Sequence, residues 1–153
     1  DAAPTVYDKV KFSEFRPPLR TEIAPAGTAD VVLTFRNVHN WLSAGNAQAM
    51  FEGFHRVLKD GGVLGVVEHR AGRELPADDR SGYVAEQTVI ALAEAAGFRL
   101  DARSDINANP ADTRDHPNGV WTLPPTNRHE DADAAKYRTI GESDRMTLRF
   151  IKD

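Results

Sequence analysis

Two short apolar runs on either side of one amphipathic segment constrain the fold of this chain most. Residues 29–35 (Ala-Asp-Val-Val-Leu-Thr-Phe) and 63–67 (Val-Leu-Gly-Val-Val) are nearly continuous in apolar character, as buried parallel strands are. Between them, apolar side chains recur at helical spacing from about Ala44 to Leu58, with Ser43 as the expected cap and Gly61-Gly62 as the stop. This strand–helix–strand order predicts a right-handed crossover within an α/β fold.

Further elements are expected on both sides of this unit. A short strand is predicted at residues 10–14, a helix from about Tyr83 to Ala96, and a strand at 98–104. The alternation of Met146, Leu148 and Phe150 with polar residues predicts a closing strand with one face more buried than the other. The polar segment 105–144, with a short helix around 132–140, is long for a connection and therefore a candidate for function.

Composition narrows the class of protein. A chain of 153 residues, 41% hydrophobic and 27% charged, is typical of one globular domain. The absence of cysteine excludes disulfides, thiolate zinc sites and cysteine nucleophiles, and leaves cytoplasm and periplasm equally open. Interspersed charges summing to −4 argue against nucleic acid as a partner, and no apolar run has the roughly 20 residues of a membrane helix.

Three stretches resemble, in order and spacing, the C-terminal half of class I S-adenosylmethionine-dependent methyltransferases. They are residues 29–34, residues 54–64 with the pattern Arg-Val-Leu-Lys-x-Gly-Gly-x-Leu, and residues 92–100. Together with residues 35–41 and 141–146, they make the chain similar to a little-characterised branch of predicted methyltransferases from about Val10 onward. The resemblance implies a Rossmann-like, mostly parallel sheet with an antiparallel closing strand, helices on its faces, and S-adenosylmethionine as cofactor.

One departure from that family is large. Its first strand, its glycine-rich turn and the acidic residue closing its second strand hold the methionine moiety and the ribose, and no residues before Val10 supply them. We therefore expect a single partial methyltransferase domain that belongs to a longer protein. The strand at 29–35 would then lack a parallel neighbour, so we expect a homodimer formed through this apolar edge.

Candidate site residues follow the expected strands, because ligands of open parallel sheets bind outside the carboxyl ends of the strands. His39 or His69 could take a proton from an attacking oxygen or nitrogen, since imidazole titrates near neutral pH, and Glu68 could orient its neighbour. Aromatic rings could form an apolar wall whose π face accommodates a sulfonium cation. The expected substrate-binding residues are Asn40, Trp41, Arg70, Asn107, Asn109 and Trp121.

The resemblance adds the cofactor side. It implies that Phe35, Arg36 and Asn37 face S-adenosylmethionine and that Glu14, at the end of its predicted strand, contacts the adenine. The polar rim suggests a small polar molecule as methyl acceptor.

Two alternatives remain open. A Rossmann-like chain without its glycine turn could be a non-catalytic binding or assembly module, with residues 105–144 wrapping a partner. His39, Glu68, His69 and Asp105 could instead hold zinc or iron, although no pair has the i, i+4 spacing of a helical metal motif and we expect no metal. A serine hydrolase is disfavoured because no Gly-x-Ser-x-Gly occurs.

Overall fold

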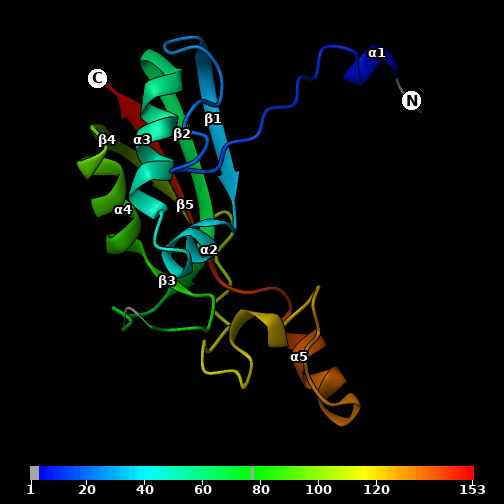
Figure 1. The fold of residues 1–153 in the computed structure, drawn as a ribbon. Coiled ribbons are helices and arrows are strands. Elements are labelled where there is room, and N and C mark those ends of the chain that lie inside the picture. The colour runs from blue at the N-terminus through cyan, green and yellow to red at the C-terminus, as the bar shows by residue number, and fades with distance from the viewer. Residues whose placement is uncertain (1–3, 77) are drawn as a thin grey trace.

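The computed structural model describes residues 4–76 and 78–153, and a mixed sheet lies at its centre (Figure 1). The strands β1 (Ala29–Phe35), β2 (Leu58–Ala71), β5 (Arg145–Lys152) and β4 (Phe98–Ser104) lie side by side in that order, and β3 (Val84–Ala85) pairs with the end of β2. Only β5 runs against the others, since β1 and β3 are parallel to β2 while β5 is antiparallel to both β2 and β4. The predicted mostly parallel α/β sheet with an antiparallel closing strand is confirmed.

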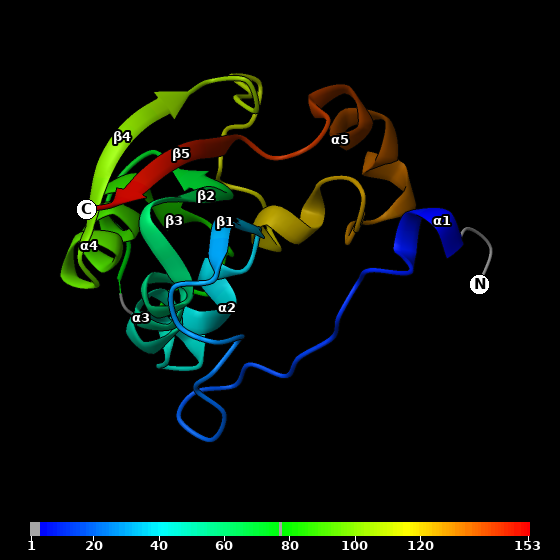
Figure 2. The same cartoon turned by 90° about the horizontal axis from the view of Figure 1, so that it is seen from above.

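Helices cover one face of this sheet, as Figures 1 and 2 show for α3 (Ala47–Val57) and α4 (Glu86–Ala95). Alternation along β2 turns Leu64 and Val66 toward these helices, where both are fully buried. They pack with the helix side chains and the inward-facing residues of β5 into one core: Phe51, Phe54, Val89, Ile90, Met146, Leu148 and Phe150. Removing this apolar surface from water is the main stabilising contribution to the fold.

The opposite face of β1 is open. Val31, Leu33 and Phe35 share this face and are 53%, 60% and 56% exposed. The expectation that the strand at 29–35 is covered on both faces is therefore wrong, because β1 lies at the edge of the sheet and α3 and α4 cover its other side. The result is an apolar stripe on an edge strand.

The predicted helix at 44–58 is confirmed as α3, which begins three residues later than expected, and a further short helix that was not predicted precedes it. Gly45 adopts a left-handed backbone conformation with φ of 71°, which ends α2 (Val38–Ser43) before α3 begins at Ala47. Ser43 is thus the last residue of α2 and not the cap of α3, a place taken by Asn46.

Other boundaries also differ from expectation. The strand predicted at 63–67 runs from Leu58 to Ala71, so Gly61 and Gly62 lie within β2 and do not end the helix, which stops at Val57. Residues 10–14 form no strand, and Phe12 is 96% exposed, because nothing in the described chain offers this segment a pairing partner there. The helix expected from Tyr83 begins only at Glu86, since Val84 and Ala85 pair with the end of β2 as β3.

Residues 105–144 lie beyond the carboxyl ends of the parallel strands, as Figures 1 and 2 show. They contain two 3-10 turns, η1 (Gly119–Thr122) and η2 (Asp131–Asp133), followed by α5 (Ala134–Ile140), which confirms the short helix predicted near 132–140. At the other end of the chain, α1 (Pro4–Tyr7) stands apart from the sheet (Figure 2). Among the residues that the structure describes, no helix is long and apolar enough to cross a membrane.

Candidate functional site

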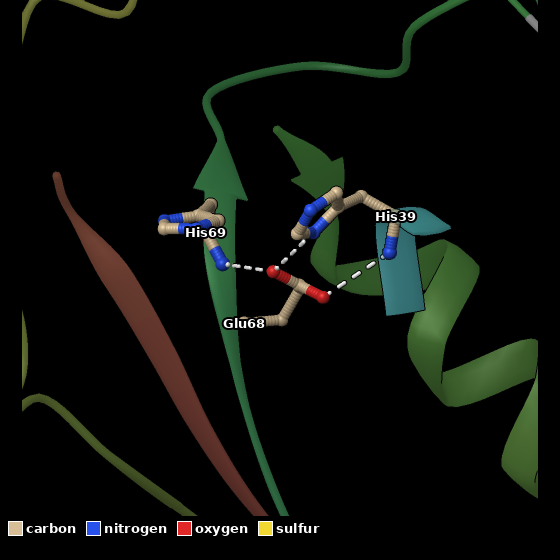
Figure 3. Close-up of side chains that lie close together, drawn as sticks. All are labelled: His39, Glu68 and His69. Carbon is tan, nitrogen blue, oxygen red and sulfur yellow. Dashed lines mark hydrogen bonds and ion pairs between the residues drawn. The ribbon is translucent and has the colours of Figure 1, made fainter. Parts of the chain in front are cut away.

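A buried glutamate lies at the centre of the candidate site. Glu68 is near the end of β2 on the helix-covered face, and its side chain is 0% exposed. One carboxylate oxygen, Oε2, accepts a hydrogen bond from the backbone N–H of His39 at 3.2 Å, and Oε1 accepts one from the backbone N–H of His69 at 2.8 Å (Figure 3). The N–H of His39 belongs to the first turn of α2, where backbone donors lack a partner within the helix.

The side chain of His39 makes a third hydrogen bond to this carboxylate. Its ring nitrogen Nδ1 lies 3.1 Å from Oε1 of Glu68, and its side chain is 12% exposed (Figure 3). A carboxylate can only accept, so Nδ1 carries the proton in this contact and Nε2 is left as the proton-accepting atom of the neutral ring. A histidine oriented by a buried carboxylate is the arrangement that general-base catalysis uses.

His69 differs from His39 although the two rings lie 5.4 Å apart between centroids. Its Nδ1 lies 2.5 Å from the hydroxyl oxygen of Ser143. Burial lowers the pKa of His69 to about 4, and the positive charges of Arg36 and Arg145 act in the same direction against the opposing effect of Glu68. His69 is therefore neutral near pH 7 and a weak base, which favours His39 as the proton acceptor.

The same three residues also form the arrangement that a metal site would need. The donor atoms of His39, Glu68 and His69 lie within 4.8 Å of one another. Asp105 is not among them, because it is 81% exposed and pairs with Arg70 at 3.0 Å. The oxygens of Glu68 already accept from two backbone N–H groups and one imidazole, which favours a carboxylate–histidine pair over a metal centre.

Two cavities meet at His39. A polar cavity of about 390 Å³ lies at the end of β1 and is lined by Phe35, Arg36, Asn37, His69 and Glu142, among others. An apolar cavity of about 380 Å³ lies between α2 and β3 and is lined by Leu42, Leu75, Tyr83 and Val84, among others. Both are of the size of small-molecule sites, and His39, Asn40 and Trp121 line both.

Trp121 reaches this junction because two glycines let its turn approach β3. The backbone N–H of Val120 donates to the carbonyl oxygen of Ser81 at 2.8 Å. A Cβ at Gly119, whose φ is 55°, would lie 2.0 Å from that same oxygen, and one at Gly82 would lie 3.1 Å from the Trp121 ring. Any larger residue at Gly119 would push η1 and its tryptophan away from the site.

Two buried aspartates hold the 105–144 segment over the strand ends. Asp112 accepts hydrogen bonds from the hydroxyl of Tyr83, a ring nitrogen of His116 and the backbone N–H of Asp144. Asp144 accepts in turn from Arg70 and Arg114. Burial alone would raise the pKa of Asp144, but hydrogen bonds from these two guanidinium groups lower it to about 2. The network therefore contains a charged carboxylate at neutral pH.

The structure separates the residues predicted for the site into two groups. Those at the junction or in the polar cavity are Phe35, Arg36, Asn37, His39, Asn40, Glu68, His69 and Trp121. The others lie elsewhere. Trp41 is partly buried and packs against the core, with ring centroids 5.5 Å from Phe54 and 6.4 Å from Phe51.

The remaining predicted residues make other contacts. Arg70 and Asn109 belong to the Asp144 network, and the side chain of Asn107 donates to the hydroxyl of Thr147. Glu14, expected at the end of a strand, is exposed and pairs with Arg20 at 3.1 Å, so it is not brought to the polar cavity.

The apolar cavity was not foreseen in the sequence. Its wall includes Tyr83 and Val84, at the start of the two-residue strand β3, and so short a strand is hidden by the helical pattern that follows directly. Leu42 and Leu75 reach the same space from segments 33 residues apart in sequence, so no local pattern marks them as neighbours.

Comparison with known proteins identifies the fold. No family model matches the sequence, and a search of curated proteins finds no relative. Among solved structures, the [4+2]-cyclase SpnF matches 85% of this chain with a TM-score of 0.54 and 20% identity. An S-adenosylmethionine-dependent methyltransferase from Methanosarcina mazei also matches 85%, with a TM-score of 0.55 and 11% identity.

These matches confirm the resemblance at the level of fold: the chain has the class I fold of S-adenosylmethionine-dependent methyltransferases. It spans 53% of the matched SpnF chain and 62% of the Methanosarcina mazei chain.

Proposed function

We propose that this chain is the C-terminal part of an S-adenosylmethionine-dependent methyltransferase that acts on a small molecule. The observation that carries the proposal is the position of His39, which is oriented by a buried carboxylate at the junction of two cavities of different polarity. Such a junction suits methyl transfer to an oxygen or nitrogen that carries a proton, because it holds donor and acceptor together beside a group that removes this proton. The fold supports the same reaction class without establishing it.

The polar cavity suits one part of the cofactor. A sulfonium cation is stabilised by the π face of an aromatic ring and by a carboxylate, and Trp121 and Glu142 supply both there. Phe35, Arg36 and Asn37 would hold the cofactor from the end of β1, as the resemblance implies. When bound, S-adenosylmethionine supplies the methyl group.

The residues of the chain supply positioning and a base. His39 takes the proton of the acceptor at Nε2 while Nδ1 stays hydrogen-bonded to Glu68. The buried carboxylate stabilises the positive charge that the ring then carries, more strongly than it would in water. Ser143 and the neutral His69 hold the neighbouring wall of the polar cavity in place.

Calorimetry with S-adenosylhomocysteine tests the proposal. The titration is run on the 153-residue chain and on the longer protein from which we propose it comes. We expect saturable binding by the longer protein and much weaker binding by the chain alone, since the glycine-rich turn is not in this sequence. Binding by neither would overturn the proposed function.

A non-catalytic assembly module is the second candidate, and the exposed side chains of Val31, Leu33 and Phe35 favour it. Such a stripe is larger than the scattered apolar residues that ordinary surfaces carry. A longer protein that binds no S-adenosylhomocysteine but forms a stable complex through β1 would establish this alternative.

A further inference from the structure

The apolar cavity has a chemistry that narrows the methyl acceptor. We propose that it binds a small flat phenol, a molecule with one hydroxyl on an aromatic ring, with that hydroxyl at His39. That the phenol is methylated rests on the proposed function. That a phenol binds here rests on the cavity alone. It departs from the small polar acceptor expected from the sequence.

The apolar part of the cavity wall is aromatic and aliphatic, and the polar side chains of Asn40, Ser43, Asp79, Arg80 and Thr88 line the rest. Trp121 forms one side, with its ring centroid 5.9 Å from that of His39 at an interplanar angle of 74°. Leu42, Leu75 and Val84 contribute apolar surface around it. An acceptor with several hydroxyls would leave some of them unpaired against these side chains, at a cost that a single-hydroxyl ring avoids.

Several polar groups in the cavity wall make contacts within the protein. The hydroxyl of Tyr83 donates to Asp112 at 2.9 Å, and Oδ1 of Asp79 accepts from both the backbone N–H and the hydroxyl of Ser81. The hydroxyl of Thr88 lies 3.3 Å from the carboxylate of Glu74. His39 is then the group whose chemistry matches a phenolic proton, since its Nε2 accepts while Glu68 stabilises the charge.

His39, the phenol and the methyl donor together account for every bond and proton in the transfer step. The phenolic O–H proton moves to Nε2 of His39, and the oxygen lone pair forms the new O–CH₃ bond. The carbon–sulfur bond of the donor breaks as this bond forms, and its electron pair stays on sulfur, giving neutral S-adenosylhomocysteine. His39 afterwards returns its proton to solvent.

Nuclear magnetic resonance of the 153-residue chain tests the ligand class. The chain has two tryptophans, so its spectrum contains two indole N–H signals, and Trp41, packed against the core, is an internal control for Trp121 in the cavity. We expect 4-methylphenol to shift the Trp121 signal saturably and to leave the Trp41 signal in place. 4-Methylcyclohexanol has the same hydroxyl without the flat ring and should bind at least about tenfold more weakly, and glycerol should shift neither signal.

A matched pair of variants ties the shift to this cavity. Leu42 lies on α2, lines the cavity and is 39% exposed. Leu42→Asp places a carboxylate in the cavity wall and should weaken 4-methylphenol binding about tenfold or more. Leu19→Asp makes the same change at a leucine that is 80% exposed and does not line the cavity, and should bind as the parent chain does. An unmoved Trp121 signal, an equal response to glycerol, or equal binding by both variants would each overturn the inference.

The same samples separate this inference from the proposed function. Titration with 4-methylaniline distinguishes a hydroxyl from an amine, and binding of the amine at least as tight as that of the phenol would overturn the hydroxyl assignment. If the phenol binds here while the longer protein binds no S-adenosylhomocysteine, the cavity assignment stands and the proposed function fails. The reverse result preserves the function and rejects the phenol.

Discussion

Burial and hydrogen bonding distinguish His39 from His69. Both follow predicted strands, and the sequence offered no ground for ranking one above the other as a base. The structure provides that ground, because Nδ1 of His39 pairs with a buried carboxylate while Nδ1 of His69 pairs with the hydroxyl of Ser143. Such a difference depends on a residue 74 positions away in sequence, which a local pattern does not encode.

Replacing His39 should remove the base without unfolding the protein. In the longer protein, His39→Ala should lower the rate of methyl transfer about 100-fold or more, which is the usual contribution of a general base. His129→Ala is the control, because His129 is partly exposed, stacks on Tyr137 and lines neither cavity, so its loss should leave the rate unchanged. Equal rates for the parent and His39→Ala would contradict the assignment, with circular dichroism confirming that both are folded.

His69 should make the fold less stable in mild acid. Its pKa of about 4 in the folded protein lies below the usual 6.5, so the unfolded chain binds a proton first as the pH falls. Stability is therefore highest above pH 6.5 and falls between pH 6.5 and 4. For this residue alone the loss from pH 7 to pH 5 should be on the order of 1–2 kcal/mol.

Urea unfolding at pH 7 and pH 5 checks this assignment. His69→Gln removes the titrating group and should show a smaller loss of unfolding free energy between the two pH values than the parent chain. A loss of the same size in both proteins would assign the acid sensitivity to other groups.

Elements bounded by glycine were predicted most accurately. The strand at 98–104 agrees with the structure at both ends, and it begins directly after Gly97, whose φ is 99°. The strand at 29–35 agrees equally well, between a turn containing Gly27 and the left-handed residue Arg36. The helix predicted from about Ala44 begins only at Ala47, because Gly45 has a left-handed backbone conformation that separates α3 from the unpredicted helix α2.

The failures at this scale have a common cause. Residues 10–14 have the composition of a strand, but a strand exists only where another strand pairs with it. Val84 and Ala85 show the reverse, since they become β3 because the end of β2 reaches them. In both cases the deciding partner is remote in sequence.

Replacing Gly119 should destabilise the protein by more than the strain of its positive φ alone. Gly119→Ala introduces a Cβ that would lie 2.0 Å from a backbone oxygen of Ser81, so the turn must move. Gly61→Ala is a matched control, because Gly61 also has a positive φ, of 74°, but its Cβ would meet nothing within 4 Å. We expect Gly119→Ala to cost at least about 1 kcal/mol more than Gly61→Ala in urea unfolding.

The indole N–H signal of Trp121 shows whether η1 is the part of the structure that Gly119→Ala displaces. Gly119→Ala should shift its indole N–H signal and leave that of Trp41 in place, since Trp121 is carried by η1. Equal unfolding free energies for the two glycine variants would contradict a close approach of η1 to Ser81.

At the scale of the whole molecule, helices cover one face of the sheet, and the sheet ends in two edge strands, β1 and β4. The sequence predicted an apolar edge at the strand 29–35, and the structure adds that one face of this strand is exposed as well. Since alternation was absent, the sequence could not tell which of its side chains faced the helices. That assignment follows from the register of β1 on β2, where Val32 lies beside Leu64 and Thr34 beside Val66.

An exposed apolar edge strand should bring two copies of the chain together. Val31, Leu33 and Phe35 lie on one face of β1, whose outer backbone groups are free to pair with another strand because β2 is its one neighbour in the described sheet. Leu33→Lys puts a charge into this stripe and should convert dimers to monomers in sedimentation velocity experiments at high concentration. Leu19→Lys makes the same change at a leucine that is 80% exposed and lies away from β1, and it should leave the dimer intact. A parent chain that stays monomeric, or a Leu33→Lys variant that still dimerises, would show that this stripe does not mediate association.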